Sequence, residues 1–453
     1  MKKIIIFFAL ITIVINAFGQ IPNMESVLKR LSDSGSVYTQ KVQQWNTDTL
    51  IVLSQAKDSS SYSFYLITGN NNTAYQTTLV LSDVVKDFKI FNNTIWFCGS
   101  IVPPFTGSPA GFIAYASLQD LFVNQSYYIR DTKPMLSLDK IEICIDPNTH
   151  NTIICGIGKD HFEQSFFYSD DAAHISLVFP APNANEIFDD IIIKQDYTNP
   201  NNPINRAFVV GRSTLLPNIL GVRQFDISNP FNNAGSYNII PNSINMFFTE
   251  PLVADSLTYK FIAVAGIMTN NIGSFEEINV FKIDIYNPQA AIIDEILFDG
   301  NSIAANFSLK DLMLYSINPN HYKLLLLGYF PMIPNATSSV IDIDFINHSF
   351  LNDFAHIYFP PTNILFNSFT KNNLQKIIIT GIEHNININT FEVNPLHILP
   401  NDCYAIDSTS MHYRDFIINP SPLQSITTPQ EARFNWWQRH AQGYSQNINI
   451  ICQ

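Results

Sequence analysis

The segment that decides the fold is KLLLLGYF, Lys323–Phe330, in which four leucines are followed directly by a glycine. Five further segments have the same form, an apolar run that ends at a glycine: TIWFCGS (94–100), TIICGIG (152–158), RAFVVGR (206–212), FIAVAGI (261–267) and KIIITGI (376–382). The closing glycines, Gly99, Gly156, Gly211, Gly266, Gly328 and Gly381, are 53 to 62 residues apart. Self-similarity at a nearly fixed period indicates a repeat architecture.

Each repeat contains several short strands. An alternating segment such as KDFKIF (86–91) and a polar turn precede the apolar run, and two further strand-like segments follow it. These segments are rich in β-branched and aromatic residues and are separated by Asn, Pro, Asp and Gly, which is typical of strands and turns. A weaker seventh copy, Asp48–Gln55, has Ser54 in place of the glycine.

Four antiparallel strands repeated about seven times predict an all-β fold, a seven-bladed β-propeller of four-stranded antiparallel blades. The expected blades are 36–83, 84–132, 137–182, 186–242, 244–300, 304–361 and 363–402. If 36–83 is not a blade, the ring has six. The rival architecture, an open β-helix, usually repeats at about 20 to 30 residues.

A propeller also explains the composition of the apolar runs. The second strand of each blade is covered on both faces, so it is continuously apolar rather than alternating. We expect the glycine at the end of that strand, where a β-carbon would collide with neighbouring chain.

Over Val37–Pro400 the repeat resembles kelch-type propellers, whose blades also place a glycine after an apolar second strand. The chain differs from kelch blades in having single glycines and no regularly spaced tryptophan. The resemblance implies a propeller architecture, and it does not imply a particular ligand or activity.

The N-terminus predicts export. Lys2 and Lys3 precede an apolar run over 4–15, and Ala17 and Gly19 form a small-residue cleavage site, so residues 1–19 read as a signal peptide. We therefore expect a secreted, periplasmic or cell-surface protein, with an N-terminal segment over 20–35, the propeller over 36–402 and a closing or capping segment over 403–453. No later run of 18 apolar residues predicts a membrane span in the mature protein.

The two terminal segments are expected to differ from the repeats. Residues 22–34 and TTPQEARFNWWQRHAQGY (427–444) are predicted to form short helices, the latter with Thr428 as its cap and Pro429 in its first turn. Between the propeller and that helix, YRDFIINPSP (413–422) is predicted to supply a closing strand.

Composition restricts the partners and the disulfides. The net charge of −13 disfavours a nucleic-acid partner, because a negative surface repels phosphate groups. We also expect a monomer. Among five cysteines, Cys98 and Cys155 precede repeat glycines and are expected to be small, buried hydrophobic residues. Cys403 and Cys452 bracket the C-terminal segment and are the predicted disulfide. The sequence contains no C-x-x-C motif, so it does not predict a zinc site of that kind.

The candidate ligand-binding residues come from the first strand of each repeat. These strands begin with a polar residue in six of the copies: Asp87, Asp139, Asp190, Glu250, Asp311 and Asn367. In a propeller the first strand lines the central channel, so these residues are predicted to ring the channel mouth. Such a ring suits Ca²⁺ or a cationic ligand. The alternative is simple solvation of strand ends, since Lys86, Lys140 and Lys310 stand beside three of the acids.

No motif identifies a catalytic residue, because the chain has no H-E-x-x-H, G-x-S-x-G or Walker-type loop. The leading interpretation is a secreted propeller that acts as a non-catalytic binding or scaffold module for a protein or glycan at the cell surface, without a cofactor. The alternative is a carbohydrate-active hydrolase or lyase that uses carboxylates at the channel mouth. Two carboxylates about 5 to 9 Å apart in a cleft would favour the enzyme.

Overall fold

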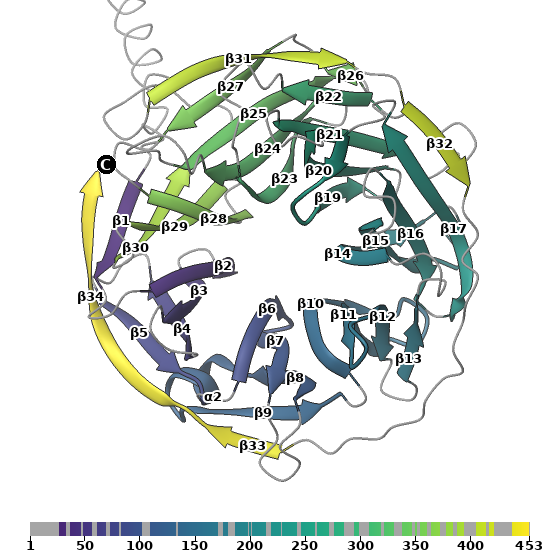
Figure 1. Ribbon diagram of the computed structural model, residues 1–453. Helices are drawn as coiled ribbons and strands as arrows, with labels where there is room; N and C mark the ends of the chain where they lie inside the picture. The colour runs from purple at the N-terminus through teal and green to yellow at the C-terminus, as the bar shows by residue number, and fades with distance from the viewer. Residues whose placement is uncertain are drawn as a thin grey trace, which may run out of the picture.

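The computed structural model describes residues 27–32, 37–46, 49–56, 61–68, 73–80, 83–101, 109–132, 135–170, 175–179, 186–197, 199–200, 202–213, 219–227, 229–241, 246–258, 261–270, 276–284, 294–298, 308–318, 321–329, 338–346, 349–350, 354–359, 364–371, 377–383, 387–393, 405–413, 416–420 and 437–452. The predicted signal peptide lies outside these residues. The described chain is all-β, with antiparallel sheets. Figure 1 shows the sheets side by side around a central opening, a propeller-like arrangement.

Successive antiparallel strands form units, and each unit is named here by the strand nearest the central opening (Figure 1). The β2 unit contains β2 (Val37–Asn46), β3 (Thr49–Ala56), β4 (Tyr62–Thr68) and β5 (Thr73–Thr78). The β6 unit contains β6 (Asp83–Phe91), β7 (Thr94–Ile101), β8 (Ala110–Ala116), the short helix α2 (Leu118–Phe122) and β9 (Ser126–Asp131). The β10 unit contains β10 (Met135–Ile145), β11 (Thr152–Asp160), β12 (Ser165–Asp170) and β13 (Ile175–Val178).

The remaining units repeat this order. The β14 unit contains β14 (Glu186–Asp196), β15 (Ile204–Ser213), β16 (Leu220–Asp226) and β17 (Asn229–Pro241). In the β19 unit, β18 (Met246–Phe248) and β19 (Val253–Thr258) both pair with β20 (Phe261–Asn270), and β21 (Glu276–Asp284) and β22 (Asp294–Phe298) follow. The β23 unit contains β23 (Ser308–Asn318), β24 (His321–Tyr329), β25 (Ser338–Ile346), β26 (Ser349–Phe350) and β27 (Phe354–Phe359). The β28 unit contains β28 (Ile364–Lys371), β29 (Ile377–Glu383) and β30 (Asn387–Val393).

The N-terminal strand joins the last unit to the first. β1 (Val27–Ser32) pairs with β30 on one side and with β34 (Gln442–Cys452) on the other. β34 also pairs with β5, so that the β2 and β28 units belong to one nine-stranded sheet. β1 and β34 therefore connect the unit that ends at Thr78 with the unit that begins at Ile364.

The C-terminal strands form an outer belt, which comprises β31 (Ala405–Tyr413), β32 (Phe416–Pro420), β33 (Trp437–His440) and β34. β31 pairs with both β22 and β27, β32 with β17, and β33 with β9. The belt strands thus follow the outside of the ring from the β23 unit back to the β2 unit, which is opposite to the chain order of the units (Figure 1).

Two expectations for the termini need correction, and one is confirmed. The helix predicted over 22–34 is wrong for Val27–Ser32, which is strand β1, and the helix predicted over 427–444 is wrong for Trp437–His440, which is strand β33. In each case an open sheet edge supplies partners for the backbone, and this tertiary pairing overrides local helix propensity. The strand predicted in YRDFIINPSP is confirmed as β32, although it pairs with β17 of the β14 unit and does not join the first and last units.

A β-bulge explains the glycine that ends five of the apolar runs. In the β2, β6, β10, β14, β23 and β28 units the first strand carries one extra residue, so the register with the second strand shifts there: the bulge residues are Gln40, Lys86, Asp139, Asp189, Lys310 and Asn367. Gly266 of the β19 unit differs, because a β-carbon there would meet the side chains of Leu252 and Phe248. The residue before the bulge faces Gly99, Gly158, Gly211, Gly328 or Gly381, and Ser54 in the β2 unit. A bulge bends its strand. A β-carbon on Gly99, Gly158 or Gly211 would overlap the carbonyl oxygen of Val84, Ser137 or Ile187 respectively.

This register corrects one detail of the repeat. Gly158, and not Gly156, is equivalent to Gly99, because Gly158 faces the residue before the bulge of β10. Cys155 is therefore not equivalent to Cys98, although both are buried and free. The predicted pairing of Cys403 with Cys452 involves side chains outside the described part of the structure.

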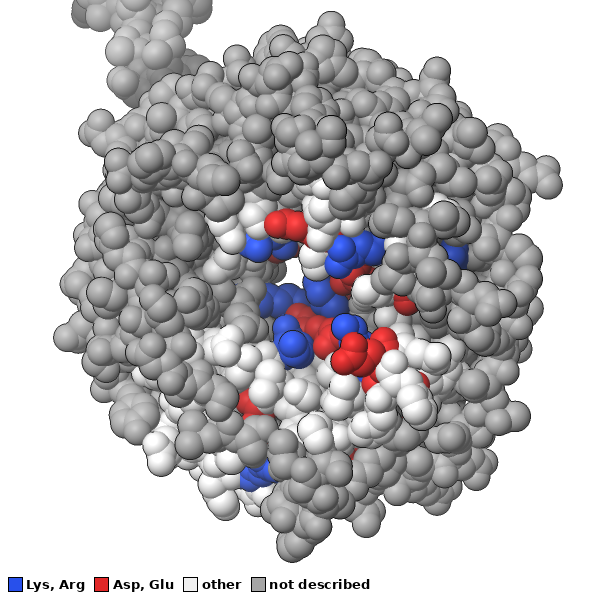
Figure 2. Space-filling view, in the orientation of Figure 1, with Lys and Arg blue, Asp and Glu red and all other residues white. Residues whose placement is uncertain are grey.

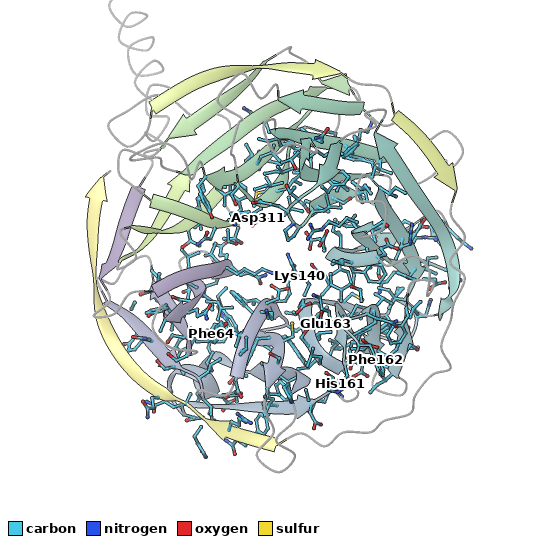
Figure 3. The ribbon with its side chains drawn as sticks, viewed as in Figure 1. Phe64, Lys140, His161, Phe162, Glu163 and Asp311 are labelled. Atoms are coloured by element: carbon cyan, nitrogen blue, oxygen red, sulfur yellow. The ribbon has the colours of Figure 1, made fainter. Side chains whose placement is uncertain are left out.

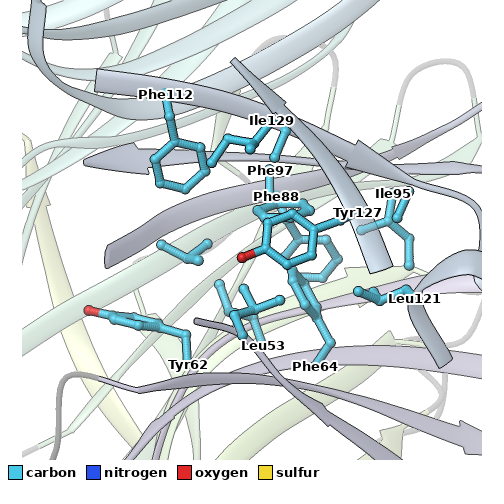
Figure 4. Close-up of a cluster of buried hydrophobic side chains, with 14 of the residues drawn as sticks. Leu53, Tyr62, Phe64, Phe88, Ile95, Phe97, Phe112, Leu121, Tyr127 and Ile129 are labelled. Atoms are coloured by element: carbon cyan, nitrogen blue, oxygen red, sulfur yellow. The ribbon is translucent and has the colours of Figure 1, made fainter. Parts of the chain in front are cut away.

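The hydrophobic core lies between neighbouring units. One cluster joins β3 and β4 of the β2 unit to the β6 unit, with Phe64 packed edge-to-face on Phe88 and Phe97 at centroid distances of 5.4 and 5.3 Å (Figure 4). Corresponding clusters join the β6 unit to the β10 unit, the β10 unit to the β14 unit, and the β14 unit to the β19 unit. The apolar second strands are thus covered on both faces, which accounts for Leu324–Leu327 being buried.

Candidate functional site

A cavity of about 390 Å³ lies at the centre of the ring. Its lining comes from the first strand of every unit: β2, β6, β10, β14, β19, β23 and β28. Figure 2 shows lysine and arginine side chains interspersed with aspartate and glutamate around the central opening, and Figure 3 shows Lys140 and Asp311 there. The charged lining residues are Lys41, Lys86, Asp87, Lys89, Lys140, Glu142, Asp190, Lys194, Asp255, Lys310 and Asp311.

The bulge sets which side chains enter the cavity. The residue after the bulge lines the cavity in the β2, β6, β10, β14, β23 and β28 units: Lys41, Asp87, Lys140, Asp190, Asp311 and Ser368. Opposite charges alternate along the first four of these. Lys41 forms an ion pair with Asp87, and Lys140 Nζ lies 3.3 Å from Asp190 Oδ1. Neighbouring units are therefore connected by ion pairs at the same structural position.

The carboxylates at this position also accept backbone hydrogen bonds from the next unit. Asp87 Oδ2 accepts from the amide of Ile141, 3.0 Å away. Asp190 Oδ2 accepts from Ala254, and Asp311 Oδ2 from Phe369, both also at 3.0 Å. In the β28 unit, Ser368 Oγ accepts from Val42 of the β2 unit at 3.3 Å. These contacts hold the first strands of successive units together.

A second layer of polar contacts lies further along β2, β6, β10 and β19. Gln43 accepts from the amide of Ile90 at 2.7 Å and donates to the carbonyl of Phe88 at 3.1 Å. Lys89 Nζ lies 2.5 Å from Glu142 Oε1. Asp255 Oδ2 accepts from the amide of Leu314 at 2.8 Å. Most polar groups at the cavity wall therefore have defined partners on the adjacent unit.

The acids of the cavity differ in pKa. Burial opposes ionisation of Asp87, but Lys41, Lys140 and Lys89 outweigh it and lower its pKa. Burial raises the pKa of Asp255 to about 6, against the attraction of Lys194 and the hydrogen bond from Leu314. Burial likewise raises the pKa of Asp311. The pKa of Lys140 is raised, mainly by Asp190.

The structure places four of the six sequence-predicted site residues at this cavity: Asp87, Asp190, Asp311 and Asn367. Asp139 is a bulge residue that lines a second cavity of about 370 Å³, together with Lys86, Ser137 and Lys159.

The sixth predicted residue, Glu250, lies at the boundary of the β19 and β23 units. There its carboxylate accepts from Ser308 Oγ at 3.1 Å and from the amide of Leu309 at 3.2 Å. Glu250 is not among the described residues that line either cavity.

The sequence prediction missed half of the charged lining, because it considered only the start of each strand. Lys41, Lys89, Glu142, Lys194 and Asp255 also face the cavity. Alternation along the first strand carried that signal, since Asp87 and Lys89, or Lys140 and Glu142, are two residues apart and lie on the same face of their strand. The bulge sets the frame of that alternation, and its sign in the sequence is the glycine on the facing strand, such as Gly99 or Gly211.

No family model matches the chain, and no curated protein matches it. Among the described residues, no three His, Cys, Asp or Glu side chains are grouped as ligands for a metal ion. The part of the chain that the structure describes contains no helix long and apolar enough to cross a membrane.

Proposed function

We propose that the units form a seven-bladed β-propeller, loosely kelch-like, which is exported and acts as a non-catalytic binding or scaffold module. Its ligand would be a protein or a glycan at the cell surface, and the central cavity would be the ligand site. The signal-peptide pattern supports export.

The observation that carries this proposal is the way the cavity carboxylates are held. Asp87, Asp190 and Asp311 each accept an amide hydrogen bond from the adjacent unit, and two of them also pair with lysine. A general acid or base must exchange its proton with a substrate during turnover. Carboxylates that fix the spacing of neighbouring strands favour a rigid binding surface over acid–base chemistry.

The test is to compare binding with turnover on the same protein. The purified chain is applied to a glycan array and to extracts of surface proteins, and each ligand is then incubated with the protein while new reducing ends and unsaturated sugars are measured. We expect a ligand to be bound and recovered unchanged.

The proposal would be contradicted if the wild type cleaves a glycan and the Asp255→Asn variant does not. That result would support the alternative, a carbohydrate-active hydrolase or lyase. Asp255 is the residue to change, because its raised pKa of about 6 suits a general acid better than the pKa of Asp87, which the neighbouring lysines lower. Binding to no glycan and no protein would also contradict it.

A further inference from the structure

The positive and negative charges of the central cavity are not equally accessible. In the ion pair of Lys140 with Asp190, the lysine side chain is 39% exposed and the carboxylate 14%. In the pair of Lys41 with Asp87, the values are 23% and 4%. The carboxylates turn into the wall because backbone amides of the next unit donate to them. An ammonium group cannot accept such a bond, so the lysines remain at the cavity surface.

Further lysines add to this positive surface. Lys86 and Lys310 occupy bulge positions in the β6 and β23 units, line the cavity and are exposed. Lys310 Nζ lies 5.0 Å from the centre of the Tyr329 ring, which holds the side chain by a cation–π contact. Six of the 17 lysines of the chain line this one cavity, although the whole chain has a net charge of −13.

We propose that the central cavity binds a small polyanion, a ligand group that carries two or more carboxylates or sulfates. Ammonium groups that converge in a cleft with low-dielectric walls focus a positive potential and attract anions. The volume of about 390 Å³ falls within the usual range of small-ligand sites. Thr370 also lines the cavity, and its hydroxyl is a neutral hydrogen-bonding group for the rest of the ligand.

This inference rests on the proposed binding function and names the chemistry that the site would recognise. It differs from the expectation that a ring of carboxylates at the channel mouth would suit Ca²⁺ or a cationic ligand. A cation would have to take the carboxylates from the amides and lysines that already hold them. An anion needs no such exchange, since the lysines are the accessible charges.

The first experiment is isothermal titration of the purified protein with five probes: inorganic sulfate, citrate, a uronate oligosaccharide, a neutral oligosaccharide of equal length, and CaCl₂. We expect the anions to bind, the neutral sugar not to bind, and the affinity for the anions to fall as NaCl is raised, because salt screens exposed charges. Tighter binding of the uronate oligosaccharide than of citrate identifies the end group of a glycan as the source of the anion, and the reverse order identifies a free small anion. The proposal is overturned if CaCl₂ binds and sulfate, citrate and the uronate oligosaccharide do not.

The second experiment uses matched lysine variants. The Lys86→Gln/Lys310→Gln double variant should bind the preferred anion at least tenfold more weakly. Both lysines are exposed, so the thermal unfolding temperature should stay near that of the wild type. Lys159→Gln is the control, because Lys159 lines the second cavity with Lys86 but does not line the central one. Its affinity should not change.

Unchanged anion affinity in the double variant, or an equal loss in Lys159→Gln, overturns the assignment to the central cavity. If the double variant does not fold, charge-preserving Lys86→Arg and Lys310→Arg variants replace it and should retain binding and its salt dependence. The anion site and the proposed binding function can fail separately. A surface ligand that binds the double variant as tightly as it binds the wild type refutes the anion site but leaves the binding function in place. Glycan turnover refutes the binding function.

Discussion

At the bulge of a first strand, one extra residue has two effects. In the β6 and β14 units it brings a backbone carbonyl so close to Gly99 and Gly211 that a β-carbon on either glycine would overlap it. It also sets the frame in which the next side chain, such as Asp87 or Asp190, enters the central cavity. The repeated glycine and the charged lining are therefore two consequences of the same local geometry.

Gly99→Ala tests the first effect. The new methyl group would overlap Val84 O, so we expect the free energy of unfolding to fall by about 3 kcal/mol, the upper end of the usual cost of overpacking. Denaturant unfolding at constant m-value measures it. The matched control is Ser54→Ala, at the equivalent position of the β2 unit, where a β-carbon is already accommodated. Equal stability of Gly99→Ala and the wild type would refute the steric role of the glycine.

Asp255→Asn tests the cost of burying a carboxylate in the cavity. Its folded pKa of about 6 lies above the ordinary value of 3.8, so the folded state prefers the protonated form. The stabilisation from this group is complete below about pH 4 and is lost as the pH rises through 6. Asn can still accept from Leu314, so the variant should match the wild type near pH 4 and exceed it at pH 7, by roughly 3 kcal/mol at most.

Asp87→Asn is the control, because it should change the free energy of unfolding at pH 7 in the opposite direction. The pKa of Asp87 is lowered in the folded state, so its stabilisation is present above pH 3.8 and is lost as the pH falls. This variant should be less stable than the wild type at pH 7, and the difference should shrink in acid. If Asp255→Asn and Asp87→Asn change stability in the same direction at pH 7, the account of these pKa shifts is wrong.

Among the larger elements, the outer belt connects parts of the ring that the units leave separate. β33 is attached to the β6 unit by strand pairing with β9 and by a buried ion pair between Arg439 and Asp83, whose side chains are 11% and 0% exposed. Tyr127 donates its hydroxyl hydrogen to the other oxygen of Asp83. The belt is thus part of the folded core rather than a loosely applied cover.

Arg439→Ala tests the role of the belt. Removal of the guanidinium leaves the Asp83 carboxylate buried without its cation, which should cost about 3 kcal/mol. The thermal unfolding temperature should fall, and amide hydrogen exchange should accelerate in β33 and β9 together. Gln438→Ala, a neighbouring exposed position in β33, is the control and should change neither measurement. No change in exchange for Arg439→Ala would show that the ion pair does not hold the belt.

For the molecule as a whole, periodicity in the sequence predicted the all-β repeat fold, because burial of the second strand between units leaves a direct imprint on composition. The ends were not predicted correctly. Val27–Ser32 and Trp437–His440 are strands because partners from distant parts of the chain pair with them, and local propensity contains no information on such partners.

The candidate site was predicted in part, and for a related reason. Asp87, Asp190 and Asp311 were found from the strand starts. Asp139 was chosen because an acid opens its strand, but the residue after the bulge, Lys140, is the one that lines the central cavity. Because Lys41 and Lys140 were left out, the predicted set was a ring of acids, which suits a cation.

The central claim is that the units surround a single axis and direct lysines into one cavity. An experimental density map of the protein with the preferred anion tests it most directly. We expect seven units around the axis, β1 between β30 and β34, and anion density within hydrogen-bond distance of Lys86, Lys140 or Lys310. Two results would contradict the account: units arranged in an open row, or anion density elsewhere on the protein while the central cavity is empty.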